Sequence, residues 1–594
     1  MWFLKYNSKW VWLVLPLVGF GLWSFGSRET EKEKPNVLFI LTDDQGWGDL
    51  SLHGNPHLKT PNLDRLATQG AQFERFYVSP LCAPTRASLL TGRYHLRTGT
   101  VSVSRTLEVM NAEEVTLAEI FKENGYATGC FGKWHNGEHF PNTPNGQGFD
   151  EFLGFCAGHL TNYFDSELLH NETSFKSRGY ITDILADAAM EFMTKNKSEP
   201  FFCYVPFNAP HTPHQVPEYY FQKYKKQGLT DELASIYGMV ENVDDNVGRL
   251  LKKLDELKLT ENTIVIFATD NGPNGNRYNG DMKGVKGSVD EGGVRVPFFV
   301  RWPKKIQSKA VKSMAMHIDL LPSLVELCGF PTPKTLPLDG VSFAGKLLGK
   351  SPDVPDDRTL FTHVAQLDKN LKPTPGALRT NRYRWVWKGN EPELYDMLAD
   401  PSQKTNRANQ NPKLMKTMKE QFDDWFGRAT RELSMSERPV PVGFAGKEVE
   451  LAAHEANFSG NLRYKEGHGW AHDWLTQWTA PSDQMEWQVE SQRPVRYIAY
   501  LRYTCPEGQT GSRIQLSTGS SALKATIQEA FDPPMLPSPD RVTRKEAYEK
   551  EWRLVELGEI SVPAGVSTLR LSALSVKADE VAEIKSVVLR PKGN

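Results

Sequence analysis

Two continuously apolar segments, far apart in the sequence, place the strongest constraint on the fold. Residues 36–42 read NVLFILT and residues 263–269 read TIVIFAT. Runs of this length without polar alternation are typical of strands buried on both faces of a parallel sheet. Asp43-Asp44 follows the first run and Asp270-Asn271 the second. Because open α/β sheets place their ligand sites at the carboxyl ends of strands, the sequence predicts that these side chains meet at one edge.

Oxygen-bearing side chains gathered at one sheet edge indicate a metal site. Carboxylate and amide oxygens suit a hard cation, calcium or magnesium, better than zinc. An isolated Asp-Asp pair is explained equally well by solvated loop acids, but here a buried strand precedes the pair and glycines follow it. We therefore expect Asp43, Asp44, Asp270 and Asn271 to hold one divalent ion.

The chain between these two strands alternates helical and strand-like stretches. Residues 61–67 and 115–124 have the pattern of amphipathic helices, whereas 126–131 and 201–207 have the pattern of strands. Such alternation predicts an α/β sandwich around a mostly parallel sheet. Lys133 and His211 then fall near the ends of the two added strands.

Cys82 opens the segment LCAPTRASLLTGR at residues 81–93. Pro84 suits the first position of a helix, so the helix is predicted to begin just after Cys82. The sulfur would then lie at the positive end of a helix dipole with Arg86 nearby, which favours an anion. A buried structural cysteine is the alternative.

The pattern Cys82-x-Pro84-x-Arg86, followed by Leu-Thr-Gly-Arg, resembles the signature of the type I sulfatases. The resemblance implies an alkaline-phosphatase-like fold and conversion of Cys82 to formylglycine (3-oxoalanine) by a formylglycine-generating enzyme. It also implies a calcium ion, with magnesium as the alternative, and a formylglycine oxygen at position 82 as a further metal ligand. Thr85 departs from the family, which usually has Ser at that position.

Three more segments resemble sulfatase motifs and assign further roles. Gly-Lys-Trp-His implies sulfate binding by Lys133 and contact of His135 with the nucleophile. Asn-Ala-Pro-His implies sulfate binding by His211, although the family often has His where this chain has Asn208. The lysine-glycine loop implies that Lys286 lies on the leaving-group side, and Glu291 and Arg295 are expected to pair structurally.

The resemblance implies hydrolysis of a sulfate ester. In that mechanism the metal-activated hydrate of formylglycine attacks sulfur, the leaving alcohol takes a proton from His211 or Lys286, and collapse of the hydrate expels sulfate. One alternative is a phosphate or phosphonate ester hydrolase of the same superfamily. A catalytically silent glycan-binding protein is another.

The rest of the chain indicates four regions. Residues 1–34, with Lys5 and Lys9 before an apolar run, predict a signal peptide or anchor and a linker. The catalytic domain is expected over 35–348 and a small α+β subdomain, as in sulfatases, over 349–430. Short alternating segments over 431–594 predict a jelly-roll-like β-sandwich, which resembles carbohydrate-binding modules.

The predicted signal peptide implies export to the periplasm or the medium. A membrane-anchored protein is the alternative. The net charge of -2 argues against a nucleic-acid partner. The six cysteines show no metal-binding spacing. The expected substrate is a sulfated glycan, as in polysaccharide degradation. Loop residues expected to bind it are His139, His159, Asn162, Tyr163 and Arg277, and Trp470, Trp474 and Trp478 are interpreted either as sugar-stacking or as packing residues.

Overall fold

The computed structural model describes residues 34–350, 358–365, 370–434, 438–444, 446–519, 521–546 and 548–592. The apolar run expected to be a signal peptide or anchor lies outside these residues. The chain divides into two units, 1–34 and 35–594, and the second is described here. None of the described helices is both long and apolar enough to cross a membrane.

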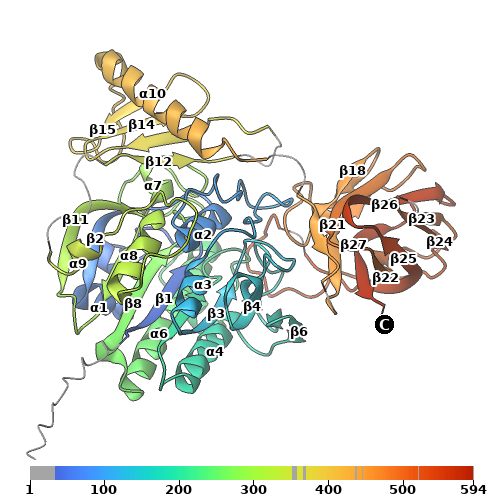
Figure 1. Cartoon of the computed structure of the whole chain (residues 1–594), viewed down its shortest axis with the longest axis horizontal. Coiled ribbons are helices and arrows are strands. Elements are labelled where there is room, and N and C mark those ends of the chain that lie inside the picture. The colour runs from blue at the N-terminus through green and yellow to red at the C-terminus, as the bar shows by residue number, and fades with distance from the viewer. Residues whose placement is uncertain are drawn as a thin grey trace, which may run out of the picture. The chain divides into compact units, whose positions relative to one another are not determined.

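A mixed sheet of eleven strands forms the centre of the domain that the sequence predicts to be catalytic (Figure 1). Strands β8, β1, β7, β3 and β4 run parallel, whereas β10 is antiparallel to both of its neighbours. In spatial order the strands are β11 (Lys309–Met316), β2 (Ala71–Tyr77), β10 (Phe298–Arg301), β8 (Thr263–Thr269), β1 (Asn36–Thr42), β7 (Phe201–Pro206), β3 (Ala127–Lys133), β4 (Glu151–Phe155), β5 (Glu167–His170) and β6 (Thr173–Lys176), with β9 (Arg295–Val296) paired to β2.

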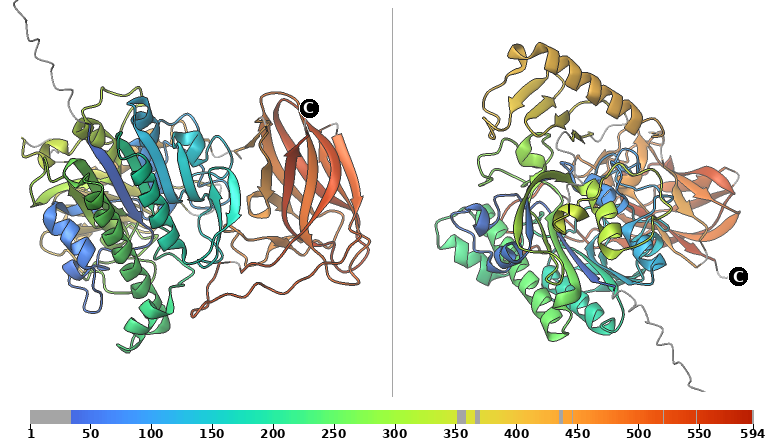
Figure 2. Two further views of the ribbon diagram at one scale, coloured as in Figure 1. Left: turned by 90° about the horizontal axis from the view of Figure 1, so that it is seen from below. Right: turned by 60° about the vertical axis from the view of Figure 1, so that its left-hand side comes forward.

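Helices cover both faces of this sheet (Figures 1 and 2). Side chains of β1 alternate between two buried clusters, Val37, Phe39 and Leu41 in one and Leu38 and Ile40 in the other. The first cluster includes α2 (Cys82–Thr91), α3 (Leu117–Glu123), α8 (Leu320–Cys328) and α9 (Ala344–Leu347). The second includes α1 (Pro61–Gln69), α4 (Ile181–Lys195), α5 (Glu218–Lys225) and α6 (Asp231–Glu256). This is the predicted α/β sandwich, and its continuously apolar strands reflect burial on both sides.

A four-stranded antiparallel sheet follows, made of β12 (Leu360–His363), β13 (Gly376–Arg379), β14 (Tyr383–Trp387) and β15 (Glu393–Asp396). Helix α10 (Pro412–Ala429) packs Met418, Phe422 and Trp425 against Leu378 and Trp385 of this sheet. The short helix α7 (Glu291–Val294) connects to this four-stranded sheet through the ion pair between Glu291 and Arg384 of β14. Glu291 lies 3.9 Å from the expected partner Arg295, but its shorter contacts are with Tyr77 and Arg384.

Two six-stranded sheets pack face to face as the predicted all-β sandwich. The first holds β16 (Val440–Val442), β21 (Gln484–Ser491), β26 (Gly565–Ser575), β23 (Arg513–Thr518), β24 (Ser521–Thr526) and β18 (Asn457–Ser459). The second holds β19 (Arg463–Tyr464), β20 (Leu475–Thr476), β27 (Glu583–Pro591), β22 (Val495–Thr504), β25 (Arg553–Val562) and β17 (Val449–Ala452).

Tryptophans of the sandwich are largely internal. Trp474 and Trp478 are fully buried, and their indole N–H groups donate to Glu583 and to the Asp483 carbonyl. Of the two interpretations open from sequence, the structure therefore supports packing for both. Trp470 is only partly buried and stacks on His468.

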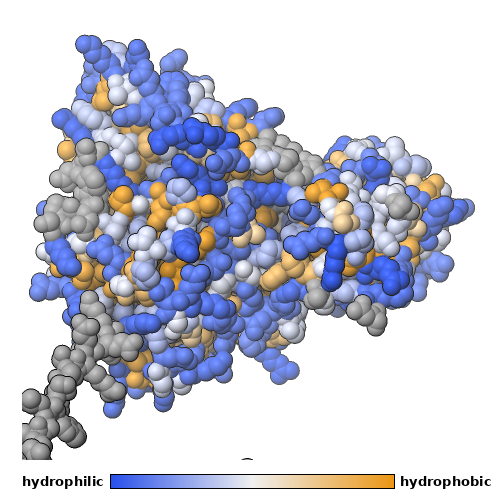
Figure 3. All heavy atoms as spheres, viewed as in Figure 1, coloured by the Kyte–Doolittle hydropathy of each residue, from blue (hydrophilic) through white to orange (hydrophobic). Residues whose placement is uncertain are grey.

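Short 3-10 helices span Ser51–His53, Pro144–Gln147, Thr260–Asn262, His317–Asp319, Ala408–Gln410 and Ala453–Glu455. All six cysteines lie in the part of the chain that the structure describes, and all are free. On the face shown in Figure 3 hydrophilic residues predominate and apolar residues form small groups among them.

Candidate active site

Four neighbouring strands deliver the predicted site residues to one edge of the sheet. Thr42 and Thr269 are register partners at the ends of β1 and β8, so Asp43-Asp44 and Asp270-Asn271 leave the sheet at the same level. Lys133 is the last residue of β3, rather than lying beyond it as the sequence pattern predicts. His211 lies in the loop that follows β7. The carboxyl ends of parallel strands therefore form the site, as expected for an open α/β sheet.

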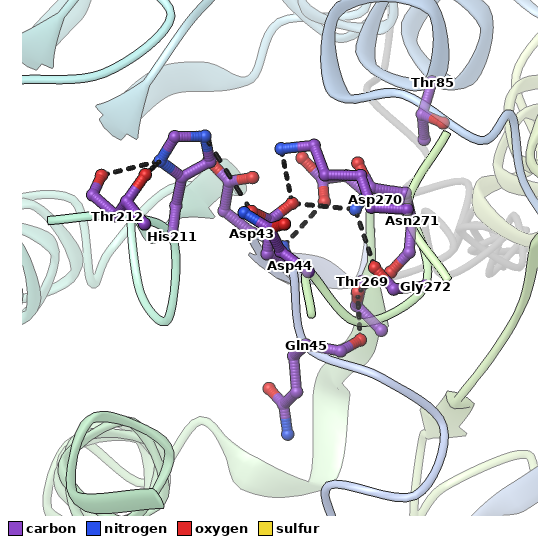
Figure 4. Close-up of polar contacts among 12 residues, drawn as sticks. Asp43, Asp44, Gln45, Thr85, His211, Thr212, Thr269, Asp270, Asn271 and Gly272 are labelled. Carbon is purple, nitrogen blue, oxygen red and sulfur yellow. Dashed lines mark hydrogen bonds and ion pairs between the residues drawn. The ribbon is translucent and has the colours of Figure 1, made fainter. Parts of the chain in front are cut away.

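The three carboxylates are fixed by direct contacts with one another and with cations (Figure 4). Asp44 has a φ of 64°, and its backbone N–H donates to Asp270 Oδ1 at 3.1 Å. Arg86 donates from Nε and Nη2 to Asp270 Oδ2 at 3.2 and 2.9 Å. Lys133 Nζ lies 2.5 Å from Asp43 Oδ2. Each carboxylate thus has at least one oxygen held in place.

Other oxygens in the same place have no hydrogen-bond partner. Asp43 Oδ1, Asp44 Oδ2 and Asn271 Oδ1 are all buried and have no hydrogen-bond partner within the described part of the chain. The ligand atoms of Asp43, Cys82 and Asp270 also lie within 4.8 Å of one another. Burying unpaired carboxylate oxygens is costly unless a cation accompanies them. This donor set fits a hard divalent cation.

Burial and the nearby cations act on these carboxylates in opposite directions. Burial raises the pKa of Asp43, but the charges of Lys133, His211 and Arg86 outweigh it and hold that pKa well below its ordinary value. Burial and the negative charge of Asp43 raise the pKa of Asp270. The nearby cations therefore outweigh burial at Asp43 but not at Asp270, where burial and the neighbouring carboxylate prevail.

Helix α2 begins at Cys82 itself and not just after it. Pro84 is accommodated because the N–H groups of the first turn have no intrahelical acceptor, so proline loses nothing there. Cys82 is 2 % exposed, and burial raises the pKa of its thiol despite Lys133 and Lys286. The prediction that these surroundings favour an anion is therefore wrong for the thiol itself, because burial and the negative charges of Asp43 and Asp270 outweigh the two lysines.

Exposure identifies where a ligand enters. The side chains of Asp43, Asp44, Asp270 and Arg86 are completely buried and that of Lys133 is 1 % exposed. By contrast, His211 is 10 % and Lys286 16 % exposed. We call the side formed by His211 and Lys286 the mouth of the site.

The two mouth residues both contact Asp44. Lys286 Nζ lies 2.7 Å from Asp44 Oδ1, and His211 Nε2 lies 3.8 Å from Asp44 Oδ2. Burial lowers the pKa of Lys286, but Asp44 outweighs it and raises that pKa, so Lys286 is charged. Burial and the charge of Lys286 lower the pKa of His211.

Two of the expected residues are placed around this cluster by other contacts. Asn271 donates from Nδ2 to Asp44 Oδ1 at 2.8 Å. His135 points Nε2 at the Val103 carbonyl, 2.9 Å away, while its Nδ1 is buried without a partner among the described residues. Burial and Lys133 hold the pKa of His135 well below its ordinary value, so it is neutral.

The residues expected to bind substrate differ in their surroundings. The His159 ring stacks on His211 with centroids 6.1 Å apart. Tyr163 is fully buried and donates its hydroxyl to the Thr212 carbonyl at 2.7 Å, so its side chain supports the His211 loop. Asn162 Oδ1 accepts from the Phe164 N–H at 3.3 Å within its own turn.

Arg277 and His139 are both engaged by carboxylates. Arg277 is 2 % exposed, binds Asp49 at 2.7 Å and donates to the Asp44 carbonyl at 2.6 Å. These contacts fix the Asp43-Asp44 turn. His139 Nε2 lies 2.9 Å from Glu455 of the sandwich.

Sequence reasoning missed three residues near the mouth, Thr212, His472 and Glu546. Thr212 Oγ1 donates to the Glu546 carboxylate, and His472 Nε2 lies 2.9 Å from the His159 carbonyl. Thr212 directly follows His211 in the sequence and could have been considered for that reason. His472 and Glu546 belong to the sandwich and carry no motif that would have pointed to them.

The fold and the site define an alkaline-phosphatase-like hydrolase whose strand ends gather three carboxylates, a buried cysteine and several cations. Residues 35–330 match the family model "Sulfatase", and residues 286–426 match "N-sulphoglucosamine sulphohydrolase, C-terminal". The chain is 31 % identical over 514 residues to the N-acetylgalactosamine-6-O-sulfatase of Bacteroides thetaiotaomicron. This match covers 68 % of this chain and 97 % of that protein.

Human arylsulfatase A is 32 % identical over 418 residues, or 62 % of this chain and 78 % of that one. The solved structure of Ps i-CgsB in complex with k-i-k-neocarrahexaose superposes with a TM-score of 0.63 at 29 % identity, over 68 % of this chain and 95 % of the other. The chain therefore belongs to the sulfatase family and is a sulfuric ester hydrolase.

Proposed function

We propose that this enzyme releases inorganic sulfate from a sulfated carbohydrate, with a formylglycine made from Cys82 and a bound calcium ion. The observation that carries the proposal is the convergence of Cys82 with Asp43 and Asp270 within 4.8 Å, beside the cations Lys133 and Lys286. A sulfate group is an anion without protons to donate, and it therefore needs positive charge and hydrogen-bond donors rather than acceptors.

Asp43, Asp44, Asp270 and Asn271 would hold the ion, because three of their oxygens are buried without partners within the described chain. When bound, the ion supplies Lewis acidity toward an oxygen at position 82 and toward the ester. Formylglycine supplies an aldehyde hydrate, whose second hydroxyl allows the sulfate to be expelled, which a thiol does not.

The protein's own residues then have separable tasks. Arg86 holds Asp270 in place and donates to the Lys133 carbonyl at 2.8 Å, so it orients both the ligand and the strand end. Lys133 and Lys286 present positive charge to the sulfate. His211 and Lys286, the two residues of the mouth, are placed to give a proton to the departing alcohol.

The carbohydrate substrate is inferred from relatives. One is named for N-acetylgalactosamine 6-O-sulfate, another is an ulvan-active sulfatase, and a solved relative holds a carrageenan oligosaccharide. We also propose export and maturation by a formylglycine-generating enzyme, on the basis of the charged and apolar N-terminal segment and the Cys82-x-Pro84-x-Arg86 motif.

The experiment is expression with and without a formylglycine-generating enzyme, followed by mass spectrometry of the peptide that spans Cys82. We expect a lighter residue that reacts with hydroxylamine, together with calcium-dependent release of sulfate from an aryl sulfate and from sulfated oligosaccharides. Cys82→Ala is the matched control. Turnover by protein in which Cys82 remains a thiol would refute the proposed chemistry.

A further inference from the structure

A long segment of the C-terminal sandwich between β24 and β25, of which residues 527–546 and 548–552 are described, extends to the catalytic domain (Figure 2). Thr212 donates its hydroxyl to the Glu546 carboxylate. Thr212 also bonds the neighbouring ring, since its carbonyl lies 2.7 Å from His211 Nδ1. A carboxylate of the sandwich is therefore one residue away from His211.

The part of this segment that precedes Glu546 is anchored to the catalytic domain. Asp540 accepts from Gln215 Nε2 at 2.5 Å, and Arg541 donates to the Val216 carbonyl at 3.0 Å. Arg544 donates to the Thr161 carbonyl and pairs with Asp540 at 2.9 Å, and both side chains are at most 10 % exposed. These buried contacts hold the Glu546 backbone in a defined place.

A second element of the sandwich borders the same region. The His472 ring packs edge-on against His159 with centroids 5.5 Å apart, and His159 stacks on His211. Lys585 Nζ binds both the His472 carbonyl and Glu549, at 2.8 and 2.9 Å. The sandwich thus contributes fixed polar groups beside the His211 side of the mouth.

Glu546 is the charged group of the sandwich that contacts the residue next to His211. Burial raises the pKa of Glu546, but the charge of His211, the Thr212 hydrogen bond and the charge of Lys286 outweigh it, so Glu546 is a carboxylate. Its side chain is partly exposed, unlike those of Asp43 and Asp44. Because the groups proposed to bind the ion are completely buried, the part of a substrate beyond the sulfate has to lie against the partly exposed ones.

We propose that Glu546 is a specificity-determining residue of this site, which accepts hydrogen bonds from hydroxyl groups of the sugar that carries the sulfate. The inference rests on the proposed sulfatase function and adds that the sandwich is part of the substrate site. A carboxylate there recognises a neutral sugar ring and disfavours a second sulfate or carboxylate next to the one that is cleaved.

The test compares Glu546→Gln with the wild-type enzyme on three substrates: an aryl sulfate without a sugar, a monosulfated sugar, and the same sugar with a second sulfate. The wild-type enzyme has to release sulfate from the aryl sulfate, or the proposed function itself fails. For Glu546→Gln we expect kcat/KM for the monosulfated sugar to fall about tenfold further than kcat/KM for the aryl sulfate, as for loss of a charged hydrogen bond to the sugar.

The same variant should raise turnover of the disulfated sugar relative to the monosulfated one. Glu551→Gln, the same substitution at an exposed glutamate of the same domain, is the matched control and should change none of the three rates. Thermal unfolding of each variant identifies loss of folding, which would lower all rates together.

Two outcomes overturn the inference. If Glu546→Gln stays folded and turns over all three substrates like the wild-type enzyme, Glu546 does not contact the sugar. If the rates on the aryl sulfate and on both sugars fall by the same factor, Glu546 acts only through Thr212 on His211 and is a positioning residue.

Discussion

Replacement of Glu291 by Gln should destabilise the enzyme by about 3 kcal/mol, because breaking a buried ion pair on one side leaves the other charge uncompensated. Glu291 joins the catalytic domain to the small sheet. Its carboxylate accepts from Tyr77 at 2.8 Å, lies 3.1 Å from Arg384 and 3.5 Å from Arg379, and is 2 % exposed. Arg384 is completely buried and would lose its ion-pair partner, keeping only the Val289 carbonyl as an acceptor among the described residues.

The magnitude follows from which contacts glutamine keeps. Removal of one partner of a buried pair costs about 3–5 kcal/mol, and the lower end applies here since the glutamine oxygen can still accept from Tyr77. With a urea m-value of about 3 kcal/mol/M for a domain of this size, the unfolding midpoint should fall by about 1 M.

Acidification should reduce the difference between the two proteins. Burial raises the pKa of Glu291, but Arg379, Arg384 and Arg295 outweigh it and lower that pKa. A carboxylate with a lowered native pKa contributes stability above its unfolded pKa of about 4.3 and loses it as the pH falls through the native value. The unfolding free energy of the wild-type enzyme should therefore decrease below about pH 4 as Glu291 is protonated. The Glu291→Gln variant has no carboxylate at this position, so its unfolding free energy lacks this pH-dependent contribution.

The assay is urea unfolding followed by tryptophan fluorescence, between pH 3 and pH 8. Glu420→Gln serves as the matched control, because Glu420 is 66 % exposed and lies 3.9 Å from Lys416 on α10. An exposed pair of this kind contributes little, so no measurable change is expected. A midpoint shift for Glu291→Gln no larger than that of the control would refute the argument.

Four further predictions concern the site and the sandwich. Chelation of calcium should lower the melting temperature reversibly, since an ion at 100 times its Kd adds about 2.7 kcal/mol; no shift on returning calcium would contradict the site. Cys82→Ala should fold normally and release no sulfate, and residual turnover would exclude the assigned nucleophile. Trp478→Ala should cost about 3–5 kcal/mol and Trp470→Ala far less, measured by denaturant unfolding; equal losses would contradict the core assignment. Arg277→Ala should weaken calcium binding and lower turnover of aryl and sugar sulfates by the same factor, whereas a loss confined to the sugar would show substrate contact.

The sequence predicted best those elements whose burial leaves a strong local pattern. Strands β1 and β8 have the predicted bounds, because a strand covered on both faces needs an uninterrupted apolar run. The site residues at their ends follow from sheet geometry alone. The start of α2 was predicted less well, since proline is tolerated throughout the first turn and does not mark its first residue.

Charged loop residues were harder to interpret, and the reason is physical. The sequence around Arg277 is compatible with two positions of its guanidinium, one facing a sugar and one facing the Asp43-Asp44 turn. Only the contact with Asp49, seen in the structure, distinguishes the two positions. Glu546 is the opposite case, because it lies 334 positions from Thr212 and no local pattern encodes their meeting. A contact between residues so far apart in sequence depends on the path of the sandwich segment in three dimensions. The sequence therefore did not predict Glu546, the residue proposed to contact the sugar. For the same reason, specificity in this chain can change through substitutions in the sandwich segment, while the residues proposed to bind the metal and the sulfate, which lie at strand ends and in loops of the catalytic domain, remain as they are.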